Sequence, residues 1–221
     1  MTTSRRPAGQ PSRRGPGRPP DADGEETRRE IQRVARGLFA THGYAGTTTR
    51  MIADEVGVTT AALHHYFGRK TNLVLALWWS TTDTEYLRLT EAIDAVDSFA
   101  GKVAALLDAT VASIRADPES TRFIVSIRED ARRTPELAEI VADNRLAALI
   151  RGLVGRGVAE GVVDEATAPA VRGTLAALLL GITTMSTDLS VERIDQMTRG
   201  SRRLLDGTLF QLRPGVTAHQ R

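Results

Sequence analysis

The 221-residue chain has an ordinary globular balance of 41% hydrophobic and 25% charged residues, with a formal net charge of +2 at pH 7. It has no cysteine, which excludes disulfides, thiolate nucleophiles and thiolate metal sites. No apolar run reaches the roughly 18 residues of a membrane-spanning helix, and the arginine-rich start lacks the apolar segment of a secretory signal. We therefore expect a cytoplasmic protein without a membrane partner.

Residues 1–24 predict a disordered, cationic tail. Five arginines and no acidic residue occur among residues 1–20, interspersed with proline and glycine. A segment with so little to bury cannot offset the entropy lost on ordering. Gly17-Arg18-Pro19 is similar to the core of an AT-hook, in which an extended arginine enters a narrow minor groove. The alternative is a solvated linker; in both cases Arg18 and its neighbours attract phosphates.

An amphipathic helix is predicted from Glu25 to His42. Glu25 and Glu26 lie in its first turn, where acidic groups favour the helix dipole, and Gly43 ends the pattern. The apolar stripe recurs at i, i+3, i+4, i+7 and i+8 and consists of Ile31, Val34, Ala35, Leu38 and Phe39. We expect this stripe to pack against the helices that follow.

Two short helices joined by a tight turn are predicted between Thr48 and Phe67. Ala53 is small where the helices would cross, and Gly57 supplies the backbone freedom that a short turn needs. The apolar faces on either side of the turn consist of Ile52, Ala53 and Val56, then Val58, Leu63 and Tyr66. This pattern is typical of a helix-turn-helix, although it also occurs in bundles that bind nothing.

The outward face of the second short helix is small and polar, which suits a major groove. It consists of Thr59, Thr60, Ala61, His64 and His65. The run Thr47, Thr48 and Thr49 precedes the first short helix. Its hydroxyls can cap that helix and can also meet a phosphate.

Motifs across residues 26–75 agree in spacing and residue type with one family. They are Gly43-Tyr44, Thr47-Thr48-Thr49-Arg50, Ile52-Ala53, Gly57-Val58, Leu63, His65-Tyr66-Phe67, Lys70 and Leu73. Together they resemble the N-terminal domain of the TetR family of bacterial transcriptional regulators. His64 and Thr71-Asn72 depart from the family pattern, which affects individual phosphate and base contacts rather than the fold.

The resemblance implies a DNA-binding domain over residues 25–70, in which Lys70 touches the DNA backbone. It also implies a homodimer on a palindromic operator of double-stranded DNA, released by a small-molecule effector. The predicted DNA-contacting set is Arg18, Thr47, Thr48, Thr49, Arg50, Thr59, Thr60, Ala61, His64, His65, Tyr66 and Lys70.

The rest of the chain predicts a larger helical bundle over residues 71–212, followed by a disordered tail at 213–221. Apolar periodicity places its helices at 71–95, 98–116, 119–132, 136–160, 166–187 and 190–212. The fold class is therefore all-α, with a three-helix helix-turn-helix domain followed by a bundle for ligand binding and dimerisation.

Ligand candidates lie on the first of these helices and on two later ones. Trp78 and Trp79 point about 100° apart on a helix, so at most one of them faces a given cavity while the other packs elsewhere. Asn144 lies on an apolar side, where its amide must find a partner in a ligand or in the protein. The predicted set is Trp78, Trp79, Thr81, Tyr86, Phe123 and Asn144.

The helix at 166–187 is apolar nearly all round, so it must be buried on all sides. In a chain of this length we expect a second subunit to cover it, together with the helix at 190–212. The predicted dimer interface consists of Leu175, Leu178, Leu179, Ile182, Leu204, Leu205 and Leu209.

Three functions remain to be weighed. The first is a ligand-responsive regulator, most simply a repressor. The second is a DNA-binding regulator or architectural protein controlled by a protein partner, without a small ligand. The third, an enzyme, is disfavoured because the histidines at 42, 64, 65 and 219 form no dyad or metal set, so we expect neither catalysis nor a metal or other cofactor.

Overall fold

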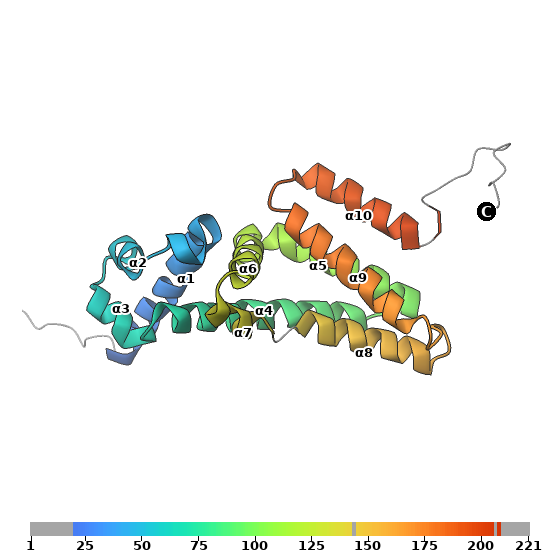
Figure 1. The fold of residues 1–221 in the computed structure, drawn as a ribbon, viewed down its shortest axis with the longest axis horizontal. Helices are drawn as coiled ribbons and strands as arrows, with labels where there is room; N and C mark the ends of the chain where they lie inside the picture. The colour runs from blue at the N-terminus through green and yellow to red at the C-terminus, as the bar shows by residue number, and fades with distance from the viewer. Residues whose placement is uncertain (1–19, 143–144, 206, 209–221) are drawn as a thin grey trace, which may run out of the picture.

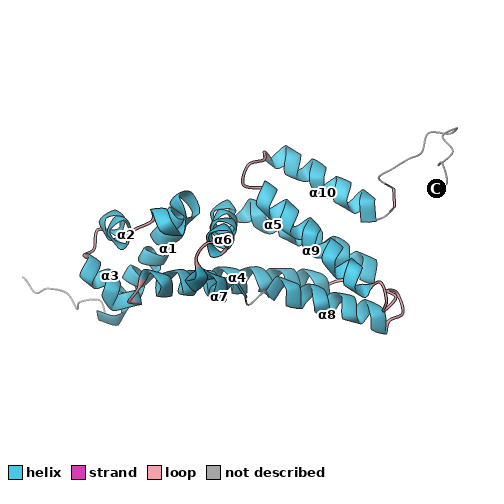
Figure 2. Cartoon of the chain, in the orientation of Figure 1, coloured by secondary structure: helices cyan, strands magenta, loops and turns pink. Residues whose placement is uncertain are grey.

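The computed structural model describes residues 20–142, 145–205 and 207–208. Over these residues the chain is all-α, as expected, and no strand occurs among them (Figures 1 and 2). The helices are α1 (Pro20–Gly46), α2 (Thr49–Val56), α3 (Thr60–Phe67), α4 (Lys70–Asp94), α5 (Phe99–Ala116), α6 (Pro118–Ala131), α7 (Pro135–Ala142), α8 (Arg145–Ala159), α9 (Ala168–Met185) and α10 (Val191–Leu205).

The helix-turn-helix end of the molecule shares its hydrophobic core with part of the bundle. Ile52, Ala53 and Leu63 of α2 and α3 are buried, and so are Phe123 and Ile127 of α6, in the same cluster. The helices α1 to α3 therefore do not close a core of their own. Helices α4, α6 and α7 supply the rest of the apolar surface that they bury.

A second core fills the other end of the elongated molecule (Figure 1). It joins the C-terminal half of α4 to α5, α8, α9 and α10. The α4 helix is the element common to both cores, with Leu73 buried in the first and Ile93 in the second. A long, continuous helix thus connects the two ends of the chain's described part.

The region predicted as one helix at 136–160 is described as two, α7 and α8. Asp143 and Asn144 lie between them, outside the described residues. Apolar side chains recur on both helices, with Leu137 and Ile140 buried on one and Leu149 on the other. A periodicity that continues in this way cannot reveal an interruption.

The apolar helix α9 has an inner face and an outer face rather than burial all round. Leu175, Leu179 and Ile182 are buried in the chain's own second core, which corrects their assignment to the interface with another subunit. Leu178 is half-buried. The exposed apolar side chains of α9 and α10, and of the residues beside them, are Leu180, Met185, Val191, Leu204 and Leu205. Leu209 lies outside the described residues.

By length and composition alone, α9 is apolar enough to cross a membrane, which differs from the expectation that no segment would reach this limit. A single helix of this kind is weak evidence for a membrane span, because core helices of bundles meet the same criterion. Here its inner face packs in the bundle, and its window includes the charged residue Arg172.

Candidate DNA-binding helix and ligand cavity

The turn between α2 and α3 is built on Gly57, which adopts a left-handed conformation with φ 79° and ψ 28°. The Gly57 N–H donates to the carbonyl of Asp54 and the Val58 N–H to the carbonyl of Ala53, at 3.3 and 3.0 Å. These two bonds form a Schellman motif, which satisfies the last carbonyls of α2. The predicted glycine turn is therefore confirmed. The turn favours glycine because its left-handed conformation is costly for a residue with a Cβ atom.

The α3 helix presents a polar face to solvent. Thr59 caps its N-terminus by accepting a hydrogen bond from the Ala62 N–H at 3.1 Å. Thr60, Ala61 and His65 are exposed, whereas Leu63 is fully buried beneath them. This is the arrangement predicted for a helix that is held from one side and open to a groove on the other.

His64 is exposed, but one of its ring nitrogens is already engaged. Its Nδ1 lies 2.6 Å from the carbonyl oxygen of Gly68, which can only accept, so Nδ1 carries the proton. The other nitrogen, Nε2, remains for an external partner. Tyr66 is partly buried and meets the His65 ring edge to face, with ring centroids 5.7 Å apart.

The three threonines before α2 have three different environments. Thr48 is the N-cap of α2 and accepts from the Met51 N–H at 3.1 Å, and Thr49 is partly buried. Thr47 is fully buried and donates to the carbonyls of Leu38 and Gly43. The expectation that Thr47 faces DNA is therefore wrong in this structure, because its hydroxyl is satisfied inside the domain.

Lys70 holds the domain together rather than pointing away from it. Its Nζ donates to the carbonyls of Tyr44 and Thr47 at 2.7 and 2.9 Å and lies 4.0 Å from the centre of the Tyr44 ring. Burial lowers the pKa of Lys70 from its usual value. The predicted phosphate contact is corrected accordingly, since the ammonium group donates to the carbonyls of Tyr44, near the end of α1, and of Thr47, between α1 and α2.

The remaining predicted DNA contacts divide between the surface and the undescribed tail. Arg50 is exposed on α2 and lies 3.6 Å from the Asp54 carboxylate, so its guanidinium group is only loosely held by an exposed pair. Arg18 lies outside the described residues.

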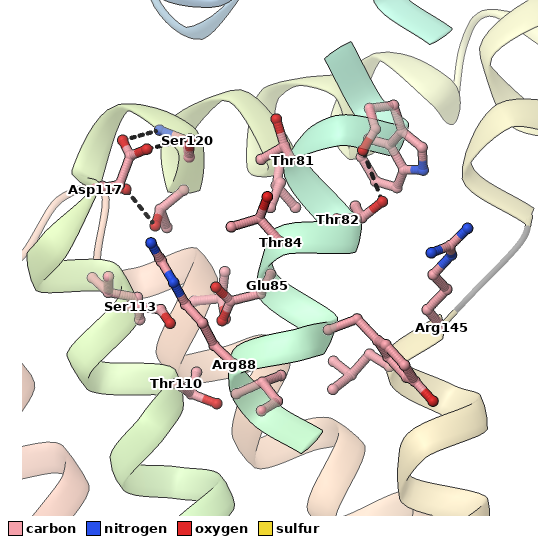
Figure 3. Close-up of a pocket in the computed structure, with 18 of the residues that line it drawn as sticks. Thr81, Thr82, Thr84, Glu85, Arg88, Thr110, Ser113, Asp117, Ser120 and Arg145 are labelled. Carbon is pink, nitrogen blue, oxygen red and sulfur yellow. Dashed lines mark hydrogen bonds between the residues drawn. The ribbon is translucent and has the colours of Figure 1, made fainter. Parts of the chain in front are cut away.

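A cavity of about 290 Å³ lies beyond the first core, between α4, α5, α6, α8 and α9. Figure 3 shows polar side chains of α4, including Thr81, Thr84 and Glu85, facing those of α5 and of the start of α6. One wall residue, Arg36, comes from α1. The cavity is thus bounded in part by the helix that begins the DNA-binding end.

The structure separates the predicted ligand residues into two groups. Trp78, Thr81 and Tyr86 line the cavity. Trp79 and Phe123 are not among its lining residues: the Arg145 guanidinium group lies over the Trp79 ring, and Phe123 is fully buried against Phe39. Their assignment to the ligand is corrected accordingly. Asn144 lies outside the described residues.

None of the charged residues of the cavity wall was predicted from the sequence. The wall includes Glu85, Arg88, Asp117 and Arg128 as well as Arg36 and Arg145. Arg128 lies in the C-terminal part of α6, in a run of charged residues. Its position on the same helical face as Ile124 was the available signal, because residues four apart lie on one face of a helix.

Burial and hydrogen bonding set the protonation of the two cavity carboxylates. Burial raises the pKa of Glu85, and a hydrogen bond from Ser113 opposes this. For Asp117, burial acts upward, but the side chain and backbone N–H of Ser120 donate to its carboxylate and leave its pKa lowered. Asp117 is also the N-cap of α6, so this charge lies where the helix dipole favours it.

The helix α6 connects the cavity to α1 through polar contacts. Arg36 donates to Glu119 at 3.3 Å, and the Ser126 hydroxyl donates to the carbonyl of Phe39 at 3.0 Å. At the far end of α6 the Tyr44 N–H donates to the Asp130 carboxylate at 2.6 Å. This last bond is available because Gly43, with φ 70° and ψ 178°, breaks the helical geometry of α1.

A second hollow, of about 450 Å³, lies between α5, α9 and α10. Its lining is mainly apolar or small, and its one charged residue, Arg202, pairs with Asp108. It borders Leu205, one of the exposed apolar side chains of α9 and α10. Although larger, it lacks the convergent polar groups of the first cavity and makes no contact with α4 or α6.

Residues 31–77 match the family model for bacterial regulatory proteins of the tetR family. These residues therefore carry a DNA-binding domain of the tetR type. The match includes most of α1, both helices of the helix-turn-helix and the start of α4. The TetR resemblance of the sequence motifs is thus confirmed.

Relatives matched by this TetR domain are transcriptional repressors rather than enzymes. The HTH-type transcriptional repressor AcnR of Corynebacterium glutamicum is 47% identical over 51 residues, which are 23% of this chain and 27% of that protein. The repressor KstR2 of Rhodococcus jostii is 30% identical over 136 residues, covering 59% and 62% of the two chains. The match therefore spans about a quarter of the length of the first relative.

Solved structures share the fold over most of the TetR-type chain. GusR of Salmonella enterica covers 83% of this chain and 95% of its own, with a TM-score of 0.67 at 24% identity. A transcriptional regulator from Saccharomonospora viridis, solved in complex with choline, covers 82% and 96% with a TM-score of 0.70 at 19% identity. At these identities the likeness is one of fold.

Proposed function

We propose that the chain is a cytoplasmic, ligand-responsive transcriptional repressor that binds a palindromic operator as a homodimer and leaves it when a small molecule occupies the bundle. The observation that carries the proposal is the shared position of α4 and α6. Both helices line the cavity, and both hold the DNA-binding end, α4 through Lys70 and α6 through Asp130.

On the DNA side, α3 is the reading element. Its exposed Thr60 and His65 stand on a short helix that Leu63 fixes from below and Thr59 caps. Threonine and histidine side chains donate and accept hydrogen bonds at base edges and phosphates. The arrangement supports major-groove contact by α3, with Arg50 and Thr48 of the preceding helix near the backbone.

A dimer supplies the second reading helix. The exposed apolar side chains of α9 and α10 form a surface that a second copy of the chain would cover. Two-fold symmetry then presents two α3 helices to half-sites related by the same symmetry, which is why the operator is expected to be palindromic.

The ligand acts by differential binding to two states. A small molecule that contacts α4, α6 and Arg36 at once favours one arrangement of these helices, and thus one position of α3. Moving the population from 1:99 to 99:1 needs about 5.5 kcal/mol of preference between the two states. The cavity favours this reading over a regulator governed only by a protein partner.

The proposal is tested by DNA binding of the full chain to the region that flanks its own coding sequence. Thr60→Ala and His65→Ala are each expected to weaken binding about 5- to 150-fold, equivalent to about 1–3 kcal/mol for a lost specific contact. Fluorescence anisotropy measures the affinity, and circular dichroism checks that α-helical folding is retained.

Arg122→Ala serves as the control, because Arg122 is an exposed arginine on α6 away from α3. It removes a full positive charge and should leave the affinity nearly unchanged. Equal affinity of the wild type and of both α3 variants would refute the placement of α3 in the groove.

A further inference from the structure

Two polar side chains in the cavity wall are almost completely buried and have no hydrogen-bond partner. Trp78 is 2% exposed and Thr81 is 7% exposed. The Nε1–H of Trp78 and the hydroxyl of Thr81 are both unpaired among the described residues. Because a buried polar group without a partner destabilises the folded chain, the presence of both residues in the wall of one cavity indicates a place for a ligand atom.

A third donor lies beside them. The Arg128 guanidinium group is 5.9 Å from the centre of the Trp78 ring, and Arg128 also lines the cavity. Burial alone lowers its pKa, with no carboxylate acting on it. By contrast, Arg36 has Glu119 and Arg145 has Asp83. Arg128 is thus a partly buried cation whose charge has no counterion in the described part of the chain.

The three groups come from two neighbouring helices that line the cavity, α4 and α6. Trp78 and Thr81 are three residues apart on α4, so they project from the same helical face. Arg128 reaches this face from α6, the helix packed beside it. Indole and guanidinium groups only donate hydrogen bonds, so a group that accepts several of them at once would satisfy the cluster.

We propose that the effector is a small organic anion, whose carboxylate head binds at Trp78, Thr81 and Arg128 and whose apolar body lies along the cavity. This rests on the proposed function only in taking the cavity as the effector site. A carboxylate accepts about four hydrogen bonds, and its charge neutralises Arg128.

Other side chains of the cavity wall suit the apolar part of the ligand. Apolar wall residues include Leu89, Ile114 and Leu179. The volume of about 290 Å³ lies just below the usual range for small-molecule sites, about 300–1,000 Å³. The ligand is therefore a compact molecule with one charged end.

A cationic ligand fits this site less well. The two carboxylates in the wall already have hydroxyl partners, Ser113 for Glu85 and Ser120 for Asp117. Figure 3 shows the Asp117–Ser120 pair at the start of α6. Burial also favours the neutral form of Glu85. An ammonium group would leave the unpaired donors of Trp78 and Arg128 without an acceptor.

The test uses the full chain without DNA and three probes of equal chain length: octanoate, 1-octanol and octyltrimethylammonium. Isothermal titration calorimetry measures each dissociation constant at pH 7. Octanoate is expected to bind at least about tenfold more tightly than either of the others, which corresponds to about 1.4 kcal/mol. Comparable or tighter binding of either of the other two probes, or no binding of octanoate, overturns the proposal.

Variants locate the carboxylate. Arg128→Gln keeps hydrogen-bond donors but removes the charge, and should weaken octanoate binding about tenfold while leaving 1-octanol unchanged. Arg122→Gln removes the same charge from the exposed face of α6 and should change neither. An equal affinity of Arg128→Gln and wild type for octanoate overturns the assignment of the head group.

Thr81→Val provides a variant that is not expected to unfold. It keeps the side-chain shape and removes a hydroxyl that has no partner, so the melting temperature of the free protein should stay equal or rise. Octanoate binding should nevertheless weaken. Unchanged octanoate binding by Thr81→Val would count against the site. Since no DNA is present, these results do not depend on whether α3 binds an operator.

Discussion

At the scale of single residues, the structure changes the roles of side chains whose positions the sequence placed correctly. Lys70 does begin α4 beside the DNA-binding helices, as predicted. Its Nζ, however, bonds two backbone carbonyls of the loop before α2. The two acceptors lie 23 and 26 residues away from Lys70 in the sequence. A local sequence pattern around Lys70 therefore cannot predict the direction of its side chain.

Replacing Lys70 distinguishes these two roles. Lys70→Met should destabilise the folded chain by about 1–3 kcal/mol, because two partly buried carbonyl acceptors lose a charged donor. Thermal unfolding measures the loss, and the salt dependence of DNA affinity should be retained. Arg69→Met, at the exposed neighbouring position, should leave stability unchanged. The phosphate contact would be supported instead if Lys70→Met were as stable as the wild type and its DNA affinity depended less on salt. In that case the slope of the logarithm of the DNA-binding constant against the logarithm of the salt concentration would be smaller by about one.

The tryptophan pair shows how far residue-level reasoning reached. Helical geometry predicted that only one of Trp78 and Trp79 would face a cavity, and only Trp78 lines it. Which of the two does so depends on α6 and α8, from which Arg128 contacts Trp78 and Arg145 contacts Trp79. That information is in the packing of helices and not in their periodicity.

At the scale of elements, the turn between α2 and α3 was predictable because its physics is local. Gly57 has φ 79°, and a side chain added there would meet no atom within 4 Å. The requirement is therefore one of backbone conformation and not of space. The role of α6 was not predictable in this way, because Glu119, Ser126 and Asp130 act through partners in α1 more than 80 residues away.

Two glycine-to-alanine substitutions should have opposite effects. Gly57→Ala is expected to destabilise the chain by about 1–2 kcal/mol, since a left-handed conformation is costly for any residue with a Cβ atom. Gly152→Ala, within α8 and also free of contacts, should stabilise it by about 0.4–1 kcal/mol. Chemical denaturation measures both. A destabilisation of similar size in both variants would show that the turn geometry is not the cause.

At the scale of the whole molecule, the all-α architecture and the order of its helices followed from hydrophobic periodicity. Hydrophobic periodicity did not show which apolar residues of α9 lie on its buried face and which on its exposed face, because nearly every face of that helix is apolar in sequence. Only the packed bundle shows that Leu179 faces inward and that Leu180 remains exposed.

From the exposed apolar side chains of α9 and α10 we predict that the chain forms a dimer through these helices. The combined variant Leu180→Arg and Leu204→Arg should be a monomer in sedimentation velocity, because desolvating two arginines in an apolar interface is unfavourable. Leu87→Arg is the control: Leu87 is 59% exposed, but it lies on α4. A wild-type chain that sediments as a monomer, or a double variant that remains dimeric, would contradict this use of the surface.

The core that α1 to α3 share with α6 and α7 has a practical consequence for protein engineering. A chimera joined at residue 70 would cut through packed side chains such as Phe39 and Phe123, whose ring centres are 6.4 Å apart. Fusing helices α1 to α3 to the ligand-binding domain of another protein would require α6 and α7 to be transferred as well. The unit that can be exchanged therefore consists of separate segments of the sequence, whereas the helix-turn-helix motif is one continuous segment.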